Sequence, residues 1–149
     1  MNYGSAFVRL PLVREPGTAR VTTPEDVARE CGDLAGLAQE SFHVLCLDSK
    51  NRLVNRHLVS LGLADASLVH PREVFRPAVS DGASAVVLVH NHPSGDPSPS
   101  SEDLRITRQL VAAGKVMGIP ALDHVVVGRR AGGEPACVSM REAGFCKFD

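Results

Sequence analysis

Hydrophobic positions along the chain follow two periodicities, which predict strands alternating with helices. Apolar runs of strand character occupy residues 40–48, 52–60, 85–89, 121–128 and 136–138. Only the turn-forming run Asp48-Ser49-Lys50-Asn51 separates the first two, so they predict a hairpin. Repeats of three and four residues predict helices over 24–31, 72–79 and 100–118. Alternating elements that include a hairpin predict an α/β fold with a mixed sheet flanked by helices.

The helix predicted over 100–118 has the clearest start and stop signals. Ser100 can cap it, Asp103 lies in its first turn, and Gly118 ends it. Its inward face is predicted to consist of Leu104, Thr107, Leu110, Val111, Gly114 and Met117. The other two helices are shorter: Thr23 caps the first, and Pro77 should shorten or kink the second.

The length of 149 residues suits one domain with its own core. No linker or internal repeat divides it, so we expect a single domain over 1–149, with residues 1–21 as an arm or an edge strand. The N-terminus lacks a signal-peptide pattern. No apolar run approaches the ~20 residues of a membrane span, so we expect a cytoplasmic protein without membrane contact.

The charge balance gives little support to nucleic-acid binding. Sixteen basic and 17 acidic residues leave a formal net charge of −1, which provides no basic field, although a local basic patch would not show in this total. The cysteines lack CxxC spacing, so we interpret them as reduced, packed thiols, with zinc ligation by one of them as the minor alternative. They are Cys31, Cys46, Cys137 and Cys146.

The strongest candidate for chemistry follows the strand predicted at 85–89. His90 and His92 are two residues apart, so on a strand they face the same side. Asp103 comes after ten further residues, in the first turn of the next helix. Two imidazoles and a carboxylate suit Zn²⁺, and three protein ligands with one water form a catalytic zinc site. The pattern therefore predicts zinc bound by His90, His92 and Asp103.

Two residues of this motif also have a purely structural interpretation. Ser100-x-x-Asp103 is a capping-box variant, in which the carboxylate reaches back to the helix cap. Capping and ligation are compatible, because Thr107 and Leu110 follow Asp103 on the predicted inward face and the carboxylate should point toward the sheet. Ser100 is either a cap alone or a hydroxyl that donates to a developing oxyanion, and spacing does not decide between them.

A zinc-activated water needs a base, for which two glutamates are candidates. Glu40 begins an apolar strand, where a charge has little structural reason to be. Glu73 lies between Arg72 and Arg76 and could form no more than a solvated ion pair. Both stay open at this point, with Glu40 favoured.

These residues resemble a known family. His90-x-His92-Pro93 followed by Ser100-x-x-Asp103 resembles the JAMM, or MPN-plus, metalloprotease motif. The segments 71–75, 90–97 and 122–124 look like the RadC family, and the similarity extends from about Thr22 to Phe145. The resemblance implies a JAB/MPN fold, a cytidine-deaminase-like arrangement of three layers.

The resemblance also implies roles for individual residues. Zinc would be held by His90, His92, Asp103 and a water, with Ser100 assisting the tetrahedral intermediate. The base glutamate of JAMM proteins begins a strand well upstream, and Glu40 is the matching position. Asp123-His124 also matches the family, and we expect it to serve structure, or to hydrogen-bond to a ligand, and not to ligate the metal.

The leading hypothesis is a zinc-dependent metallohydrolase, a metallopeptidase or isopeptidase acting on a peptide or isopeptide substrate. RadC proteins carry an N-terminal helix-hairpin-helix region that residues before Thr22 cannot accommodate, so we expect a stand-alone catalytic domain. The alternative is a DNA repair or recombination accessory protein of RadC type. A structural zinc domain is a further alternative. A nucleobase deaminase is disfavoured, because its His-x-Glu and Pro-Cys-x-x-Cys signature is missing.

Overall fold

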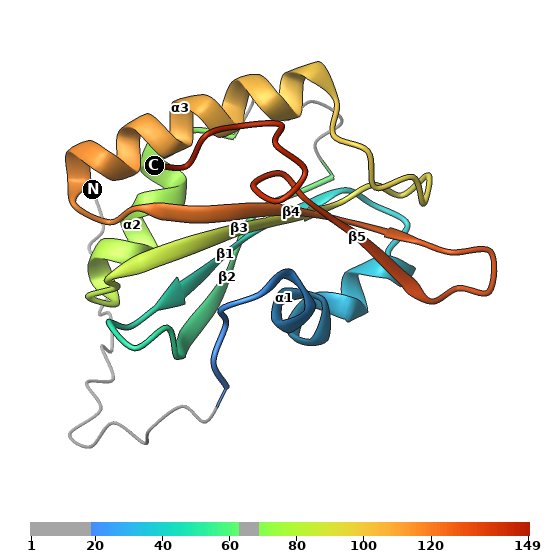
Figure 1. Ribbon diagram of the computed structural model, residues 1–149, viewed down its shortest axis with the longest axis horizontal. Helices are drawn as coiled ribbons and strands as arrows, with labels where there is room; N and C mark the ends of the chain where they lie inside the picture. Colours follow the sequence, from blue (N-terminus) through green and yellow to red (C-terminus); the bar gives the residue numbers. More distant parts are fainter. Residues whose placement is uncertain (1–18, 63–68) are drawn as a thin grey trace, which may run out of the picture.

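The computed structural model describes residues 19–62 and 69–149 (Figure 1). In chain order the elements are α1 (Pro24–Cys31), a 3₁₀ helix η1 (Gly32–Gly36), β1 (Ser41–Leu47), β2 (Leu53–Leu61), α2 (Pro71–Ser80), β3 (Ala85–Asn91), α3 (Ser101–Met117), β4 (Ala121–Arg129) and β5 (Pro135–Ser139). Every predicted helix and strand is confirmed within a few residues. Most of the predicted arm, residues 1–21, lies outside the described residues. Arg20, which is described, pairs with Arg52 through an isolated bridge.

The strands form one mixed sheet in the order β2-β1-β3-β4-β5. Strands β3 and β4 are parallel, and the other neighbouring pairs are antiparallel. A parallel pair needs a crossover connection, which α3 supplies. The predicted hairpin is β1–β2, so the α/β mixed sheet expected from the sequence is confirmed.

Helices cover both faces of the sheet and make three layers (Figure 1). Residues such as Val44, Leu88 and Val126 face α2 and α3 and form one buried cluster. Their sequence neighbours Leu45 and Val125 face the opposite way, into a second cluster with α1 and η1. Two buried faces explain why β1 and β3 are buried at every position and lack a polar alternation.

The inward face of α3 differs from the prediction at two positions. Ile106 is buried with Thr107 and Leu110, whereas Met117 is 48% exposed. Met117 lies in the last turn and lines a groove with Phe75 of α2, so it does not face the sheet. Helix α2 continues through Pro77 to Ser80, and none of the described helices could span a membrane.

The loop after β3 is held closely against β4. A side chain at Gly128 would place its Cβ 2.0 Å from the carbonyl oxygen of Gly95, so only glycine fits there. The same carbonyl accepts the backbone N–H of Arg129 at 2.8 Å. His92 is fixed in the same way, because its N–H donates to the carbonyl of Val127 at 2.9 Å. The segment between His92 and Ser100 is therefore anchored to the sheet at its start.

Candidate metal centre

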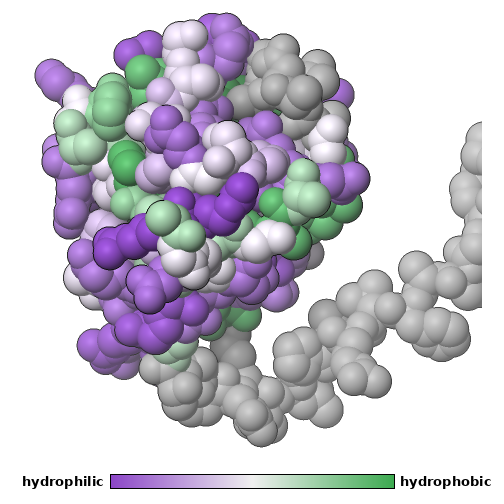
Figure 2. Space-filling model, turned by 90° about the vertical axis from the view of Figure 1, so that its right-hand side faces the viewer, coloured by the Kyte–Doolittle hydropathy of each residue, from purple (hydrophilic) through white to green (hydrophobic). Residues whose placement is uncertain are grey.

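Three elements meet where β3 ends: the start of β1, the loop after β3 and the first turn of α3, at the right-hand end of the sheet in Figure 1. Polar residues dominate the face seen from this side, with apolar residues scattered among them (Figure 2). The register of β1 on β3 pairs Phe42 with His90. Because the strands are antiparallel, this register brings Glu40, just before β1, toward His92.

The three predicted ligands converge on one point. The Nε2 atom of His92 lies 3.0 Å from Nε2 of His90 and 3.0 Å from Oδ2 of Asp103. His90 Nε2 and Asp103 Oδ2 are 3.3 Å apart. A tetrahedral zinc ion with bonds of about 2.05 Å would hold its ligand atoms about 3.3 Å apart, so these distances fit one ion.

Glu40 lies next to the three predicted ligands but farther from them than they are from one another. One of its carboxylate oxygens lies 3.9 Å from Nε2 of His90, and its side chain is 23% exposed, whereas those of His90 and Asp103 are 1% and 2% exposed. Glu40, His90, His92 and Asp103 together form a group whose donor atoms all lie within 4.8 Å of one another. A carboxylate that is more exposed than the ligands is suitably placed to meet a water.

Hydrogen bonds fix which ring nitrogen of each histidine carries its proton. His92 Nδ1 lies 2.9 Å from the carbonyl oxygen of Asp96, which can only accept, so Nδ1 is protonated. Two buried side chains, Thr107 and His124, fix the proton of His90 in turn. Thr107 donates its hydroxyl proton to the carbonyl of Asp103 at 2.6 Å and must therefore accept from His124 Nδ1, also at 2.6 Å.

His124 then has only its Nε2 lone pair left, and it accepts from His90 Nδ1 at 2.6 Å. Burial holds the pKa of His124 well below its usual range, with a further contribution from His90, so it stays neutral and can pass on this constraint. The Nε2 atoms of His90 and His92 are both left as lone pairs, and both face Asp103. Three acceptors this close together favour a positive charge between them, either a proton on His92 or a metal ion.

The electrostatics of Asp103 agree with this conclusion. Burial alone would raise the pKa of Asp103, but its close contacts with the ring nitrogens of His90 and His92 outweigh burial and hold the pKa well below its usual range. The pKa of His92 is raised, mainly by its hydrogen bond to Asp103. The site is therefore anionic at Asp103 and favours a bound positive charge, whether a proton on His92 or a metal ion.

Ser100 and Asp103 form the capping box that their spacing predicted. The Ser100 hydroxyl accepts the N–H of Asp103 at 3.0 Å, and the Asp103 carboxylate accepts the N–H of Ser100 at 2.9 Å. The oxygen Oδ2 that caps the helix is also the one that faces the histidines. Capping and membership of the candidate metal-binding group therefore coexist in Asp103, and the Ser100 hydroxyl, which accepts in this bond, also has a proton that it can donate.

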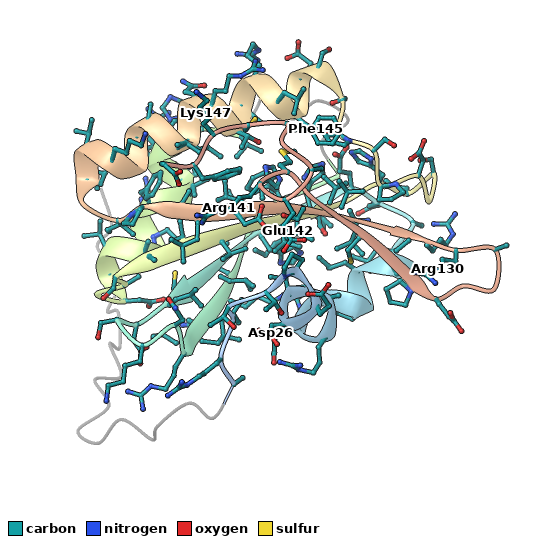
Figure 3. The ribbon with its side chains drawn as sticks, in the orientation of Figure 1. Asp26, Arg130, Arg141, Glu142, Phe145 and Lys147 are labelled. Atoms are coloured by element: carbon teal, nitrogen blue, oxygen red, sulfur yellow. The ribbon has the colours of Figure 1, made fainter. Side chains whose placement is uncertain are left out.

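Glu73 and Asp123 form their polar contacts with residues outside this group. Glu73 is 45% exposed and pairs with Arg76 at 3.2 Å, as expected of a solvated ion pair. Asp123 accepts from Ser139 Oγ at 2.5 Å and from the backbone N–H of Arg141, which Figure 3 labels at the turn after β5. Asp123 thus has a structural role, and only His124 contacts a predicted ligand. Both outcomes agree with the expectation for this pair.

Sequence reasoning missed the role of Asn91, which lies between the two histidines and faces the opposite side of β3. Its side-chain oxygen accepts the backbone N–H of Ser41 at 2.7 Å, and its amide donates to the carbonyl of Gln39 at 2.9 Å. These bonds hold the backbone on both sides of Glu40. The alternation of side chains along a strand could have indicated that Asn91 points away from the histidines, but its partners depend on the register of β1.

The comparisons with known proteins bear on this site. The chain matches the family model of the RadC-like JAB domain over residues 21–145. It belongs to the RadC-like JAB domain family. The UPF0758 proteins of Caldanaerobacter subterraneus, Listeria monocytogenes and Methanosarcina barkeri are 42%, 43% and 41% identical to it. The matches cover 95%, 92% and 93% of this chain, which spans 59% of the length of each relative.

Membership of the RadC-like JAB domain family agrees with the architecture. A mixed sheet between helices is the α/β arrangement of the JAB/MPN fold, as the resemblance implied. Within that fold, Glu40, His90, His92 and Asp103 form a group that could hold a metal ion.

Thr107 offers a test of the proton arrangement that needs no substrate. Thr107→Val removes the acceptor of His124 Nδ1–H, so His124 should shift its proton to Nε2 and force that of His90 onto the metal-facing nitrogen. We expect zinc affinity to fall about 10- to 100-fold, as measured by competition with a chelating dye. Thr107→Ser keeps the hydroxyl and should bind zinc as the wild type does. Equal affinity of both variants would contradict the proton arrangement.

His43 in β1, close to Glu40, should make stability depend on pH. Burial, assisted by the charge of Arg56, lowers the pKa of His43 to about 4. Between this value and the ordinary pKa of about 6.5, the unfolded chain binds the proton and the folded protein does not. The free energy of unfolding should therefore fall on acidification through this window, by up to about 1.4 kcal/mol per pH unit. Denaturant titrations should show a smaller fall for His43→Gln, and identical pH dependence would refute the assignment.

Proposed function

We propose that this chain is a zinc-dependent metallohydrolase that cleaves an amide bond, of the peptide or isopeptide kind. The observation that carries the proposal is the convergence of three acceptor atoms, from His90, His92 and Asp103, at 3.0–3.3 Å from one another. Their donor types are those of catalytic zinc sites, which combine three protein ligands with a water. Glu40 supports hydrolysis over a purely structural role, because a charged carboxylate lies beside the ligands.

Zinc, when bound, would lower the pKa of a water to about 7 and polarise the substrate carbonyl. The protein residues have separate tasks. Glu40 would take the proton of the attacking water and return it to the leaving amine. Ser100, whose oxygen accepts from Asp103 N–H, would donate its own proton to the oxyanion of the tetrahedral intermediate. Asn91 would hold Glu40 in place through the backbone of its two neighbours.

The reaction itself is tested by offering the zinc-loaded protein a mixed library of peptides and isopeptide-linked peptides. Mass spectrometry should detect pairs of cleavage products. The masses of the two products in a pair should add up to the mass of the parent peptide plus one water. The matched control is Glu40→Gln, which retains the ligands and should form products at least about 100-fold more slowly. Products that form equally with this variant would come from a contaminant or from another base.

A role with DNA is the alternative, and its support is the RadC-like family name. The net charge of −1 does not support DNA binding, because it provides no basic field to attract the phosphates. Filter binding of duplex DNA at two salt concentrations distinguishes the proposals, because phosphate contacts make affinity fall steeply with salt. Under the hydrolase proposal we expect no salt-sensitive binding at physiological ionic strength.

A further inference from the structure

A second group of metal-ligating side chains lies where the β1–β2 hairpin meets the end of α2. Cys46 lies in β1, His57 in β2, and Asp81 is the C-cap residue of α2. The cysteine sulfur, an imidazole nitrogen and a carboxylate oxygen all lie within 4.8 Å of one another. The closest pair is His57 Nε2 and Asp81 Oδ2, at 2.6 Å. Three different elements thus present three different donor types to one small volume.

This group is separate from the first metal centre. In the register of β1 on β3, Cys46 pairs with Val86 and Phe42 pairs with His90. The two places are four residues apart along the strand, which corresponds to roughly 13 Å. Zinc bonds are only about 2.0–2.3 Å long, so one ion cannot be shared between the two groups.

The chemistry of the group suits a cation of the zinc class. Thiolate and imidazole ligands favour zinc over magnesium or calcium, which prefer oxygen. Cys46 is fully buried, and burial together with the hydrogen bond to Asp81 raises the pKa of its thiol to about 12. The thiol therefore keeps its proton while no cation is present. A divalent ion that replaced this proton would balance one thiolate and one carboxylate.

Solvent can reach the group from one side. Cys46 lies against the core, whereas the side chains of His57 and Asp81 are 27% and 16% exposed. An ion could enter from this side and keep a water as its fourth ligand. Once bound, it would join the hairpin to the end of α2, and ligands that bind only the folded state stabilise it.

We propose that Cys46, His57 and Asp81 bind a divalent cation of the zinc class at a site independent of the His90–His92–Asp103 centre. The competing interpretation is a hydrogen-bonded cluster of a thiol, a carboxylate and an imidazole that binds no metal. The two differ in one respect that can be measured: only a metal site turns the Cys46 thiol into a thiolate ligand.

Cobalt is the probe that separates the two centres. The first centre has nitrogen and oxygen ligands, so only the second can give a thiolate-to-Co²⁺ charge-transfer band in the near ultraviolet. The metal-free chain of residues 1–149 is titrated with Co²⁺, and the band should grow and saturate at one equivalent for this site. It should persist in His92→Ala, which disables the first centre, and disappear in Cys46→Ser. Cys137→Ser, which alters a thiol outside the group, is the matched control and should keep the band.

Circular dichroism establishes that each variant is folded. If Cys46→Ser does not fold, His57→Gln serves instead, since it keeps the thiol and should weaken the band strongly. The proposal is overturned if the wild type shows no band, or if the band survives in Cys46→Ser, because another thiol would then be responsible. Failure of the first centre to bind metal would leave the band unchanged, so the proposed function and this second site are tested separately.

Discussion

Asp103→Asn should remove the metal from the His90–His92 centre while the helix cap stays intact. Asparagine can still accept the N–H of Ser100, but it lacks the charge that the two imidazole lone pairs face. We expect zinc affinity at this centre to fall by more than the 10- to 100-fold typical of a residue that only supports a ligand. Metal content after dialysis, measured by mass spectrometry, should be one equivalent lower than in the wild type.

Ser100→Ala provides the matched control, because it changes the other half of the same capping box. It removes the acceptor of Asp103 N–H and leaves the carboxylate in place. The free energy of unfolding should fall by about 1 kcal/mol with zinc retained. If Asp103→Asn kept its full metal content and lost only stability, Asp103 would be a cap and not a ligand.

Glu40→Gln should show the second large effect, on turnover with metal content unchanged. Its carboxylate lies 3.9 Å from the metal-facing nitrogen of His90, so glutamine changes the base without removing a ligand. We expect the rate of cleavage to fall about 10²- to 10⁴-fold, which is the usual contribution of a general base. The measurement is the rate with the best peptide from the library, alongside zinc content.

Glu73→Gln is the control for this experiment and should cleave at the wild-type rate, because Glu73 forms a solvent-exposed ion pair with Arg76. Loss of activity in Glu73→Gln with full activity in Glu40→Gln would reverse the assignment of the base. Loss of zinc in Glu40→Gln would instead make Glu40 a ligand.

The parts of the site that could be predicted are those coded by short-range spacing. His90 and His92 share a strand face, and Asp103 lies at a fixed place in a helix start, so few residues decide their arrangement. The helices and strands were predictable for the same reason. The inward face of α3 was predicted less well, since Met117 lies against α2 and not against the sheet.

What the sequence could not predict depends on which segments become neighbours. The contact of His124 with His90 requires the parallel pairing of β3 with β4, which sets Leu88 beside His124. The link from Asn91 to the backbone around Glu40 depends likewise on the register of β1 on β3. Cys46, His57 and Asp81 have no metal-binding spacing at all, because three elements contribute one ligand each.

The most direct measurement is an anomalous difference map at the zinc edge from crystals grown with zinc. We expect a peak bonded at about 2.0–2.2 Å to Nε2 of His90, Nε2 of His92 and Oδ2 of Asp103, with Glu40 beyond bonding distance and a water in the fourth position. A map with no peak among these three atoms, or with the fourth position filled by a protein side chain, would contradict this expectation.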